Sequence, residues 1–303
     1  KNIVATNEPK REECGAPDFL VSRTVRKCQE RIGYIETKDI GVNLSKAARS
    51  EQIKKRYLPS LDNFILTDYV SFRWYVTQEQ RAEVTLAREG KGGEFVIVKG
   101  AAEELAGLFE KFLSQEPERI TKAKKLSAKL GHLGRYLHDV IAKTFKKETQ
   151  SGSLHSQFEA FKEALLHELD EKQFSDMYAQ TICYGLFTAA CNLEGNEELT
   201  RENAQWQVPK TNPFLRKMFG YIAGVDLDER IAWLVDDVAG VLNNTRMDSV
   251  LQDFAKQSGR QDPVVHFYET FLKEYDPKLR ETRGVYYTPE AVVSFIVRSV
   301  DAI

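Results

Sequence analysis

Residues 16–39 read APDFLVSRTVRKCQERIGYIETKD, and this stretch decides the expected fold of the first part of the chain. Two apolar segments flank a turn rich in Arg and Lys, which predicts the two strands of a hairpin. Glu36 and Lys38 are two positions apart on the second strand, so they project from the same face. The hairpin brings Asp18, near the start of the first strand, alongside Glu36.

Two carboxylates and an amine in this arrangement indicate metal-dependent phosphate chemistry. Carboxylates that converge repel each other unless a divalent cation joins them, and their hard oxygens suit Mg²⁺. Such an ion neutralises a phosphate group and lowers the pKa of a bound water. The ammonium of Lys38 can orient that water or stabilise the transition state. The alternative is that Glu36 and Lys38 form an ordinary cross-strand ion pair at the surface.

The pair Pro17-Asp18, followed by Glu36-Thr37-Lys38, resembles the PD-(D/E)xK nuclease core of many restriction endonucleases. The resemblance implies an α/β domain with a mixed sheet. It assigns catalysis to Asp18, Glu36 and Lys38, with Asp18 and Glu36 as the Mg²⁺ ligands. A basic helix and a further apolar strand follow the Glu-x-Lys motif, as this resemblance requires.

One feature departs from the family pattern. Nucleases of this family usually carry a further acidic residue on a helix that precedes the Pro-Asp strand, and here only Glu12 and Glu13 are candidates, by proximity. The chain begins at Lys1 and ends at Ile303 inside an apolar periodic segment, so we expect it to be a piece of a longer protein. If the usual helix lies outside this piece, the region would fold as a nuclease core without activity.

The basic residues of the chain are concentrated in one predicted helix. Nine Lys or Arg residues and one acid, Asp139, lie between Arg119 and Lys147, although the net charge of the chain is only −2. Apolar residues there follow the spacing of one helix face, so the cations should cover the other, exposed faces. This excess favours a polyanionic partner, and a face that only increases solubility is the alternative. The residues we expect to contact DNA are Gln52, Lys54, Lys55, Lys122, Lys125 and Lys129.

The hydrophobic periodicity changes near residue 100. Residues 16–99 show short apolar runs typical of strands, interrupted by one helical stretch from Lys46 to Leu58. From Ala101 onward the period is that of helices, predicted over roughly 101–114, 118–147, 154–169, 173–193, 213–223, 229–243, 247–257, 263–275 and 289–303. With 42% apolar and 29% charged residues, the composition excludes a disordered or collagen-like chain.

The segment from Asp262 to Val297 resembles the entry to an N6-adenine DNA methyltransferase of the γ class, in which Gly284 to Pro289 corresponds to the first cofactor-binding motif. There the amide groups at the start of a helix face a carboxylate, and neighbouring aromatic rings suit a sulfonium cation. The resemblance implies S-adenosylmethionine binding by Tyr286, Tyr287, Thr288 and Pro289; a plain helix start is the alternative. The Gly-rich turn and the Asn-Pro-Pro-aromatic motif needed for catalysis are absent from the sequence, so we expect the catalytic domain beyond residue 303.

Together these resemblances describe the first part of a fused restriction–modification protein of the Type IIG or Type ISP kind. Its regions would be a nuclease domain over 1–99, a helical connector over 100–283 and the start of a methyltransferase over 284–303. The implied function is Mg²⁺-dependent cleavage of double-stranded DNA, coupled to adenine methylation by downstream methyltransferase and target-recognition domains of the same chain. A non-catalytic DNA-binding scaffold is the alternative. Without a secretory signal or a membrane-spanning run, we expect a cytoplasmic location in a bacterium.

Overall fold

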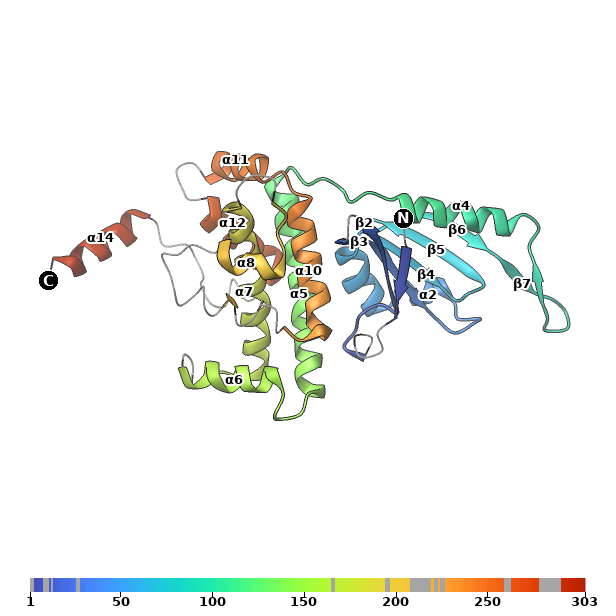
Figure 1. Cartoon of the computed structure of the whole chain (residues 1–303), viewed down its shortest axis with the longest axis horizontal. Coiled ribbons are helices and arrows are strands. Elements are labelled where there is room, and N and C mark those ends of the chain that lie inside the picture. The colour runs from blue at the N-terminus through green and yellow to red at the C-terminus, as the bar shows by residue number, and fades with distance from the viewer. Residues whose placement is uncertain are drawn as a thin grey trace. The chain divides into compact units, whose positions relative to one another are not determined.

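A mixed sheet and its helices come first in the chain, and helices alone follow (Figure 1). The computed structural model describes residues 3–7, 11, 13–25, 28–164, 167–193, 197–207, 219–220, 223, 227–258, 263–277 and 290–302. The chain forms two compact units. The first consists of Lys1–Glu118, Tyr136–Ser175 and Asp228–Trp233, and the second of Arg119–Arg135, Asp176–Leu227 and Leu234–Ile303. The predicted fold class, α/β followed by all-α, is confirmed.

The main sheet has six strands in chain order. They are β1 (Ile3–Thr6), β2 (Phe19–Val25), β3 (Cys28–Thr37), β4 (Asn63–Thr67), β5 (Ser71–Val76) and β6 (Glu79–Thr85). Neighbouring strands are antiparallel except β3 and β4, which are parallel. Every residue of β4 is buried, as expected of a strand in the middle of a sheet. The strand β1, which has four residues and is largely exposed, was not predicted.

The connection from β3 to β4 differs from the single helix predicted between Lys46 and Leu58. It consists of α2 (Leu44–Ala47), a π-helix η1 (Gln52–Tyr57) and α3 (Leu58–Ser60). The amide of Leu58 donates to the carbonyl of Ile53, the five-residue bond that defines a π-helix. This wider turn places Gln52 beside Tyr57, and the amide Nε2 of Gln52 donates to the Tyr57 hydroxyl at 2.5 Å. A regular α-helix would put these two residues about 140° apart around its axis.

One face of the sheet packs against α4 (Ala101–Ser114). The core there consists of Val21, Ile32, Ile65, Trp74, Val84, Leu108 and Phe112. Leu108 and Phe112 are four positions apart and lie on the same side of α4. We predicted that residues 101–114 belong to the connector, whereas in the structure this helix closes the core of the first unit.

A buried asparagine joins α4 to the sheet. The Nδ2 of Asn63 donates to the carbonyls of Ile32 and Phe112, at 2.8 and 2.9 Å. Its Oδ1 accepts a hydrogen bond of 2.7 Å from the indole nitrogen of Trp74. Asn63 is 6% exposed, and a buried amide is tolerated because its donors and its acceptor are satisfied.

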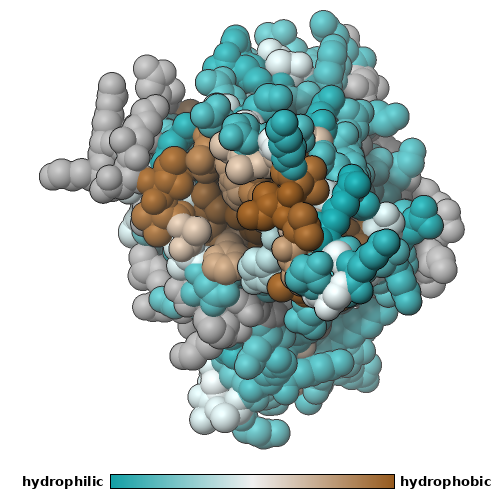
Figure 2. All heavy atoms as spheres, turned by 90° about the vertical axis from the view of Figure 1, so that its right-hand side faces the viewer, coloured by the Kyte–Doolittle hydropathy of each residue, from teal (hydrophilic) through white to brown (hydrophobic). Residues whose placement is uncertain are grey.

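A small second sheet stands apart from the main one. It is a hairpin of β7 (Ala87–Glu89) and β8 (Phe95–Ile97). Figure 2 shows apolar side chains gathered on the side of the molecule where this hairpin lies in Figure 1. The large exposed apolar residues of residues 38–100 are Ile40, Val42, Tyr69, Phe95, Val96 and Ile97.

The remaining helices agree closely with the periodicity of the sequence. They are α5 (Ala123–Lys147), α6 (Ser153–Ala164), α7 (Glu171–Cys191), α8 (Arg201–Gln207), α10 (Glu229–Asn243), α11 (Met247–Ser258), α12 (Pro263–Tyr275) and α14 (Glu290–Asp301). The short helix α8 was not predicted, and most of the helix predicted over 213–223 lies outside the described residues. Aromatic stacking fills the core of the second unit, where the rings of Phe187 and Phe267 are 3.6 Å apart.

Candidate active site

The pairing of β2 with β3 places Asp18 next to the Glu36-Thr37-Lys38 segment. Phe19 pairs with Ile35 in this antiparallel ladder, so Asp18, one position before the start of β2, lies beside Glu36. The carboxylate of Asp18 accepts two hydrogen bonds at one oxygen, Oδ2. They come from the backbone amide of Thr37 at 2.5 Å and from its hydroxyl at 2.6 Å. Thr37 therefore holds Asp18 in place, a role that the sequence analysis did not assign.

Glu36, in β3, and Lys38, one position after the end of β3, contact each other. The ammonium of Lys38 donates to Oε1 of Glu36 at 2.5 Å. The side chain of Glu36 is 5% exposed and that of Lys38 is 30% exposed. The carboxylate thus lies at the base of the site, and the amine lies at its rim, where it can meet a reactant. Glu36 and Lys38 thus form an ion pair, as the alternative expects, but Glu36 is buried and Lys38 is only partly exposed.

Burial dominates the electrostatics of Glu36. Loss of solvation raises the pKa of its carboxyl from an ordinary value of 4.5 to about 7, and the hydrogen bond from Lys38 opposes this rise. The negative charge of Asp18 also raises the pKa of Glu36, so the two carboxylates are within electrostatic reach of each other. The amine of Lys38 alone does not compensate for the burial of the Glu36 charge.

The two carboxylates fit a Mg²⁺ ion. The second oxygen of Glu36, Oε2, is buried and accepts no hydrogen bond from any described residue. An unpartnered buried carboxylate oxygen is costly, and a cation beside it would remove that cost. Among the described residues no group of three or more His, Cys, Asp and Glu side chains forms a metal cage. Mg²⁺ does not require one, because it keeps several waters and binds through one or two carboxylates.

Among the residues that the structure describes, no further acidic residue of the family pattern joins this site. Glu13 is exposed, and its carboxylate lies 3.4 Å from the ammonium of Lys147. Glu12 lies outside the described residues. Asp68 follows β4 and is buried, but its Oδ1 accepts from the amides of Val70 and Ser71, so it forms a turn.

Tyr57 lies close to both carboxylates. Its pKa is raised by burial and then by the negative charge of Glu36, with a smaller contribution from Asp18. The hydroxyl of Tyr57 donates to the carbonyl of Gly15 at 3.1 Å and receives the hydrogen bond from Gln52. We predicted that Gln52 contacts DNA. The structure shows its amide directed to Tyr57, and the contact with DNA stays a prediction.

The lysines predicted to bind DNA fall in two places. Lys54 and Lys55 are exposed on η1, and Lys55 also lies 2.9 Å from the carboxylate of Glu51. Lys122 and Lys125 are exposed at the start of α5 in the second unit, whereas Lys129 is half-buried there.

The expectation that every cation between residues 119 and 147 is exposed is wrong for Lys129, Arg135 and Lys143. Arg135 is half-buried and donates to the carbonyls of Glu274 and Tyr275 at the end of α12. Lys143 is also half-buried, and its side chain packs against Gly15. Both cations contact backbone groups of the protein, because α5 is covered on more than one face.

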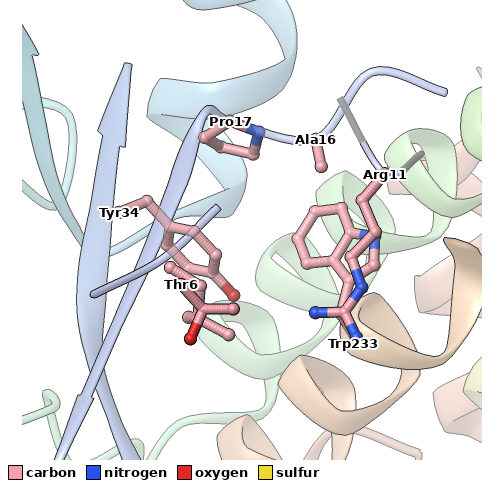
Figure 3. A pocket seen from close by; sticks show the side chains of 7 residues that line it. Thr6, Arg11, Ala16, Pro17, Tyr34 and Trp233 are labelled. Atoms are coloured by element: carbon pink, nitrogen blue, oxygen red, sulfur yellow. The ribbon is translucent and has the colours of Figure 1, made fainter. Parts of the chain in front are cut away.

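A small pocket lies beside the segment that carries Asp18. It is lined by Thr6, Arg11, Ala16, Pro17, Leu20, Tyr34 and Trp233. Figure 3 shows Arg11 alongside the Trp233 ring, with Pro17 and Tyr34 across the pocket. Its space for water-sized molecules is about 20 Å³, which is enough for a water and too little for a nucleotide.

The predicted cofactor site lies outside the described residues. This applies to Tyr286, Tyr287, Thr288 and Pro289, whose binding of S-adenosylmethionine stays a prediction. The helix expected to follow them is present as α14. No helix of the part that the structure describes has the length and apolar character needed to cross a membrane.

Comparison with solved structures finds similarity to a chain in the cryo-EM structure of a DrdV–DNA complex. The sequence identity is 21% and the TM-score is 0.29. The match covers 93% of this chain and 25% of the other, so this chain spans about a quarter of the length of its match. No family model matches the chain, and no curated protein matches it.

Proposed function

We propose that the first unit is a Mg²⁺-dependent endonuclease that hydrolyses phosphodiester bonds in double-stranded DNA. The observation that carries this proposal is the buried, unpartnered Oε2 of Glu36, beside Asp18 and below the ammonium of Lys38. If position 36 served only the stability of the fold, an apolar residue there would be more stabilising than a buried glutamate. A buried acid with one unsatisfied oxygen is instead typical of a site that binds a cation.

Each residue has a distinct role in the proposed reaction. Asp18 and Glu36 would hold Mg²⁺, and Thr37 keeps the carboxylate of Asp18 oriented through Oδ2. When bound, the ion supplies charge neutralisation at the phosphate and acidifies a water ligand. Lys38, at the rim, would orient the attacking water and stabilise the negative charge that develops on the phosphate.

The segment between β3 and β4 would bind the DNA backbone. Lys46, Arg49, Lys54 and Lys55 are exposed there, and Glu51 is the one acid among residues 44–57. Lysine and arginine contacts to phosphates release counterions and position a duplex without reading its sequence. Site recognition would therefore come from the target-recognition region expected elsewhere in the protein.

Cleavage of a supercoiled plasmid tests the assignment. With Mg²⁺ in excess, Glu36→Gln and Lys38→Met should each reduce the nicking rate by about a hundredfold or more, since each removes a charge needed in the transition state. Glu30→Gln is the matched control. It makes the same change on the same strand, at an exposed residue paired with Arg23 at 2.8 Å, and should leave cleavage unchanged. Equal cleavage by all four proteins would discard the assignment.

A second candidate function is a DNA-binding scaffold that retains a nuclease fold without catalysis. The observation that favours it is the absence of a third metal-ligating acid near Asp18 and Glu36 among the described residues. Titration calorimetry with Mn²⁺ separates the two functions. A scaffold should bind duplex DNA in EDTA and release no heat with the metal, whereas a nuclease should bind the metal and lose binding in Glu36→Gln.

The wider role rests on the sequence resemblance. We propose that this unit acts within a restriction–modification protein, in which a downstream domain uses S-adenosylmethionine to methylate adenine at N6. The helices after α4 would then set the distance between the methylated base and the cleaved bond on the DNA. In the whole protein, Glu36→Gln should abolish cleavage and leave methylation intact.

A further inference from the structure

We propose that Tyr136, on helix α5, is a positioning residue of the nuclease site, holding the backbone that leads into Asp18. The inference rests on the proposed function and adds to it a residue that no motif contains. Tyr136 lies in the half of α5 that belongs to the same compact unit as the sheet. It is 121 positions from the residue that it contacts, Gly15.

The contact is a carbonyl shared by two tyrosines. The hydroxyl of Tyr136 donates to the carbonyl oxygen of Gly15 at 2.6 Å, and the hydroxyl of Tyr57 donates to the same oxygen at 3.1 Å. Tyr136 is 1% exposed and Tyr57 is fully buried, with ring centroids 5.8 Å apart. Both donors are buried side chains, so this carbonyl takes two hydrogen bonds from inside the protein.

The carbonyl of Gly15 is three residues from the carboxylate that would bind the metal. Between them stand Ala16 and Pro17, and proline fixes one of the two soft dihedral angles of its backbone. Gly15 itself has φ +102°, a conformation that only glycine adopts readily. A short, stiff connection transmits a displacement of Gly15 to Asp18 instead of absorbing it.

Neighbouring residues of α5 support the same segment. Asp139 lies 2.6 Å from the guanidinium of Arg56 on η1, and Lys147 lies 3.4 Å from Glu13. Lys143 packs over Gly15, where an added Cβ would lie 2.7 Å from its ammonium nitrogen. With Tyr136, these residues are spaced by three, four and four positions, so one face of α5 contacts both η1 and the segment before Asp18.

Loss of the Tyr136 hydroxyl should therefore weaken the metal site more than the fold. In Tyr136→Phe the ring stays in its packed position, while the Gly15 carbonyl keeps only the longer bond from Tyr57. Asp18 should become less well oriented, and the Mg²⁺ concentration that gives half-maximal cleavage should rise about fivefold, the factor that corresponds to one ordinary hydrogen bond. At saturating Mg²⁺ the rate should return to within about twofold of wild type.

Tyr75→Phe is the matched control. It removes a phenol hydroxyl from a buried tyrosine of the same unit, on β5, where the hydroxyl donates to Gln80 at 3.4 Å. Both variants should show similar small changes in thermal stability, and only Tyr136→Phe should shift the Mg²⁺ dependence. In the double variant Tyr57→Phe/Tyr136→Phe, the Mg²⁺ concentration for half-maximal cleavage should rise by more than the product of the two single fold-changes. In each single variant the remaining hydroxyl still bonds the Gly15 carbonyl.

The assay includes wild type and Glu36→Gln so that two kinds of failure are separated. If wild type cleaves, Glu36→Gln does not, and Tyr136→Phe has the Mg²⁺ dependence of wild type, the role of Tyr136 is wrong and the nuclease assignment stands. A rate reduced equally at every Mg²⁺ concentration also contradicts the positioning role. If wild type does not cleave, or if Glu36→Gln cleaves as well as wild type, both proposals are overturned.

Discussion

The ammonium of Lys38 donates a hydrogen bond of 2.5 Å to one oxygen of Glu36, while the other oxygen of Glu36 is buried without a partner among the described residues. One oxygen of this buried carboxylate thus has a hydrogen-bond partner and the other has none among the described residues. This asymmetry supports the proposed metal site, because both oxygens of a buried carboxylate are usually bonded. It also makes the site sensitive to pH and to divalent cations.

Stability should depend on pH through Glu36. Its pKa rises from 4.5 to about 7 on folding, so the favourable contribution of the neutral acid is present below pH 4.5 and is lost as the pH rises through 7. Besides burial, Lys38 and Asp18 are the groups that act on it. Relative to Glu36→Gln, which cannot ionise, wild type should lose about 3 kcal/mol of unfolding free energy between pH 4.5 and 8. Urea denaturation in EDTA measures this; a difference independent of pH would contradict it.

Mg²⁺ should reverse this loss. An ion that binds the ionised carboxylates of the folded protein stabilises it in proportion to its occupancy. The increase in melting temperature on adding Mg²⁺ should therefore be larger at pH 8 than at pH 5, and it should vanish in Glu36→Gln. Glu30→Gln should respond to Mg²⁺ as wild type does. An equal response of all three proteins would show that the ion binds elsewhere.

Substitution of Gly15 should disrupt the segment before Asp18. Gly15→Ala combines a positive φ with a Cβ placed 2.7 Å from the Lys143 ammonium nitrogen, and we expect a loss of about 2–3 kcal/mol of unfolding free energy. Gly41→Ala is the control, because Gly41 has φ +87° and no atom within 4 Å of an added Cβ. It should lose about 1 kcal/mol. Denaturant titration compares the two, and equal losses would rule out crowding by Lys143.

The Asn63 network should be the most sensitive polar contact of the core. Asn63→Ala leaves the Trp74 indole nitrogen and the carbonyls of Ile32 and Phe112 buried without their partner. We expect a loss of about 3 kcal/mol or more, measured by chemical denaturation. Asn43→Ala removes an exposed helix cap, whose side chain accepts from Lys46, and should lose about 1 kcal/mol. Similar losses in both variants would argue against the network.

DNA binding should show the salt dependence of phosphate contacts. Lys54→Ala and Lys55→Ala should each weaken binding to duplexes of any sequence. Each should also lower the slope of log affinity against log salt by about 1. Lys111→Ala changes an exposed lysine on α4, across the sheet from the site, and should leave the slope unchanged. Fluorescence anisotropy in EDTA measures both quantities, and an unchanged slope in the η1 variants would place the DNA on another surface.

Some parts of the site could be read from the sequence because they depend on neighbours in the chain. Glu36 and Lys38 share a face since side chains alternate along a strand, and the helices after residue 100 follow from their periodicity. The π-helix could not be predicted this way. Gln52 and Tyr57 are five positions apart, and this spacing matches no regular amphipathic pattern. Their contact is a hydrogen bond between two side chains, which the sequence pattern does not reveal.

The sequence by itself determined most strands, most helices and the presence of two acids and an amine in one hairpin. Only the tertiary structure decided that Glu36 is buried with one oxygen unsatisfied, that Thr37 holds Asp18 and that Tyr136 reaches Gly15. The physical reason is the range of the interactions. The alternation of side chains along a strand and the period of a helix act over a few residues. Burial depends on packing between distant segments, and the bond from Tyr136 to the Gly15 carbonyl joins residues more than a hundred positions apart.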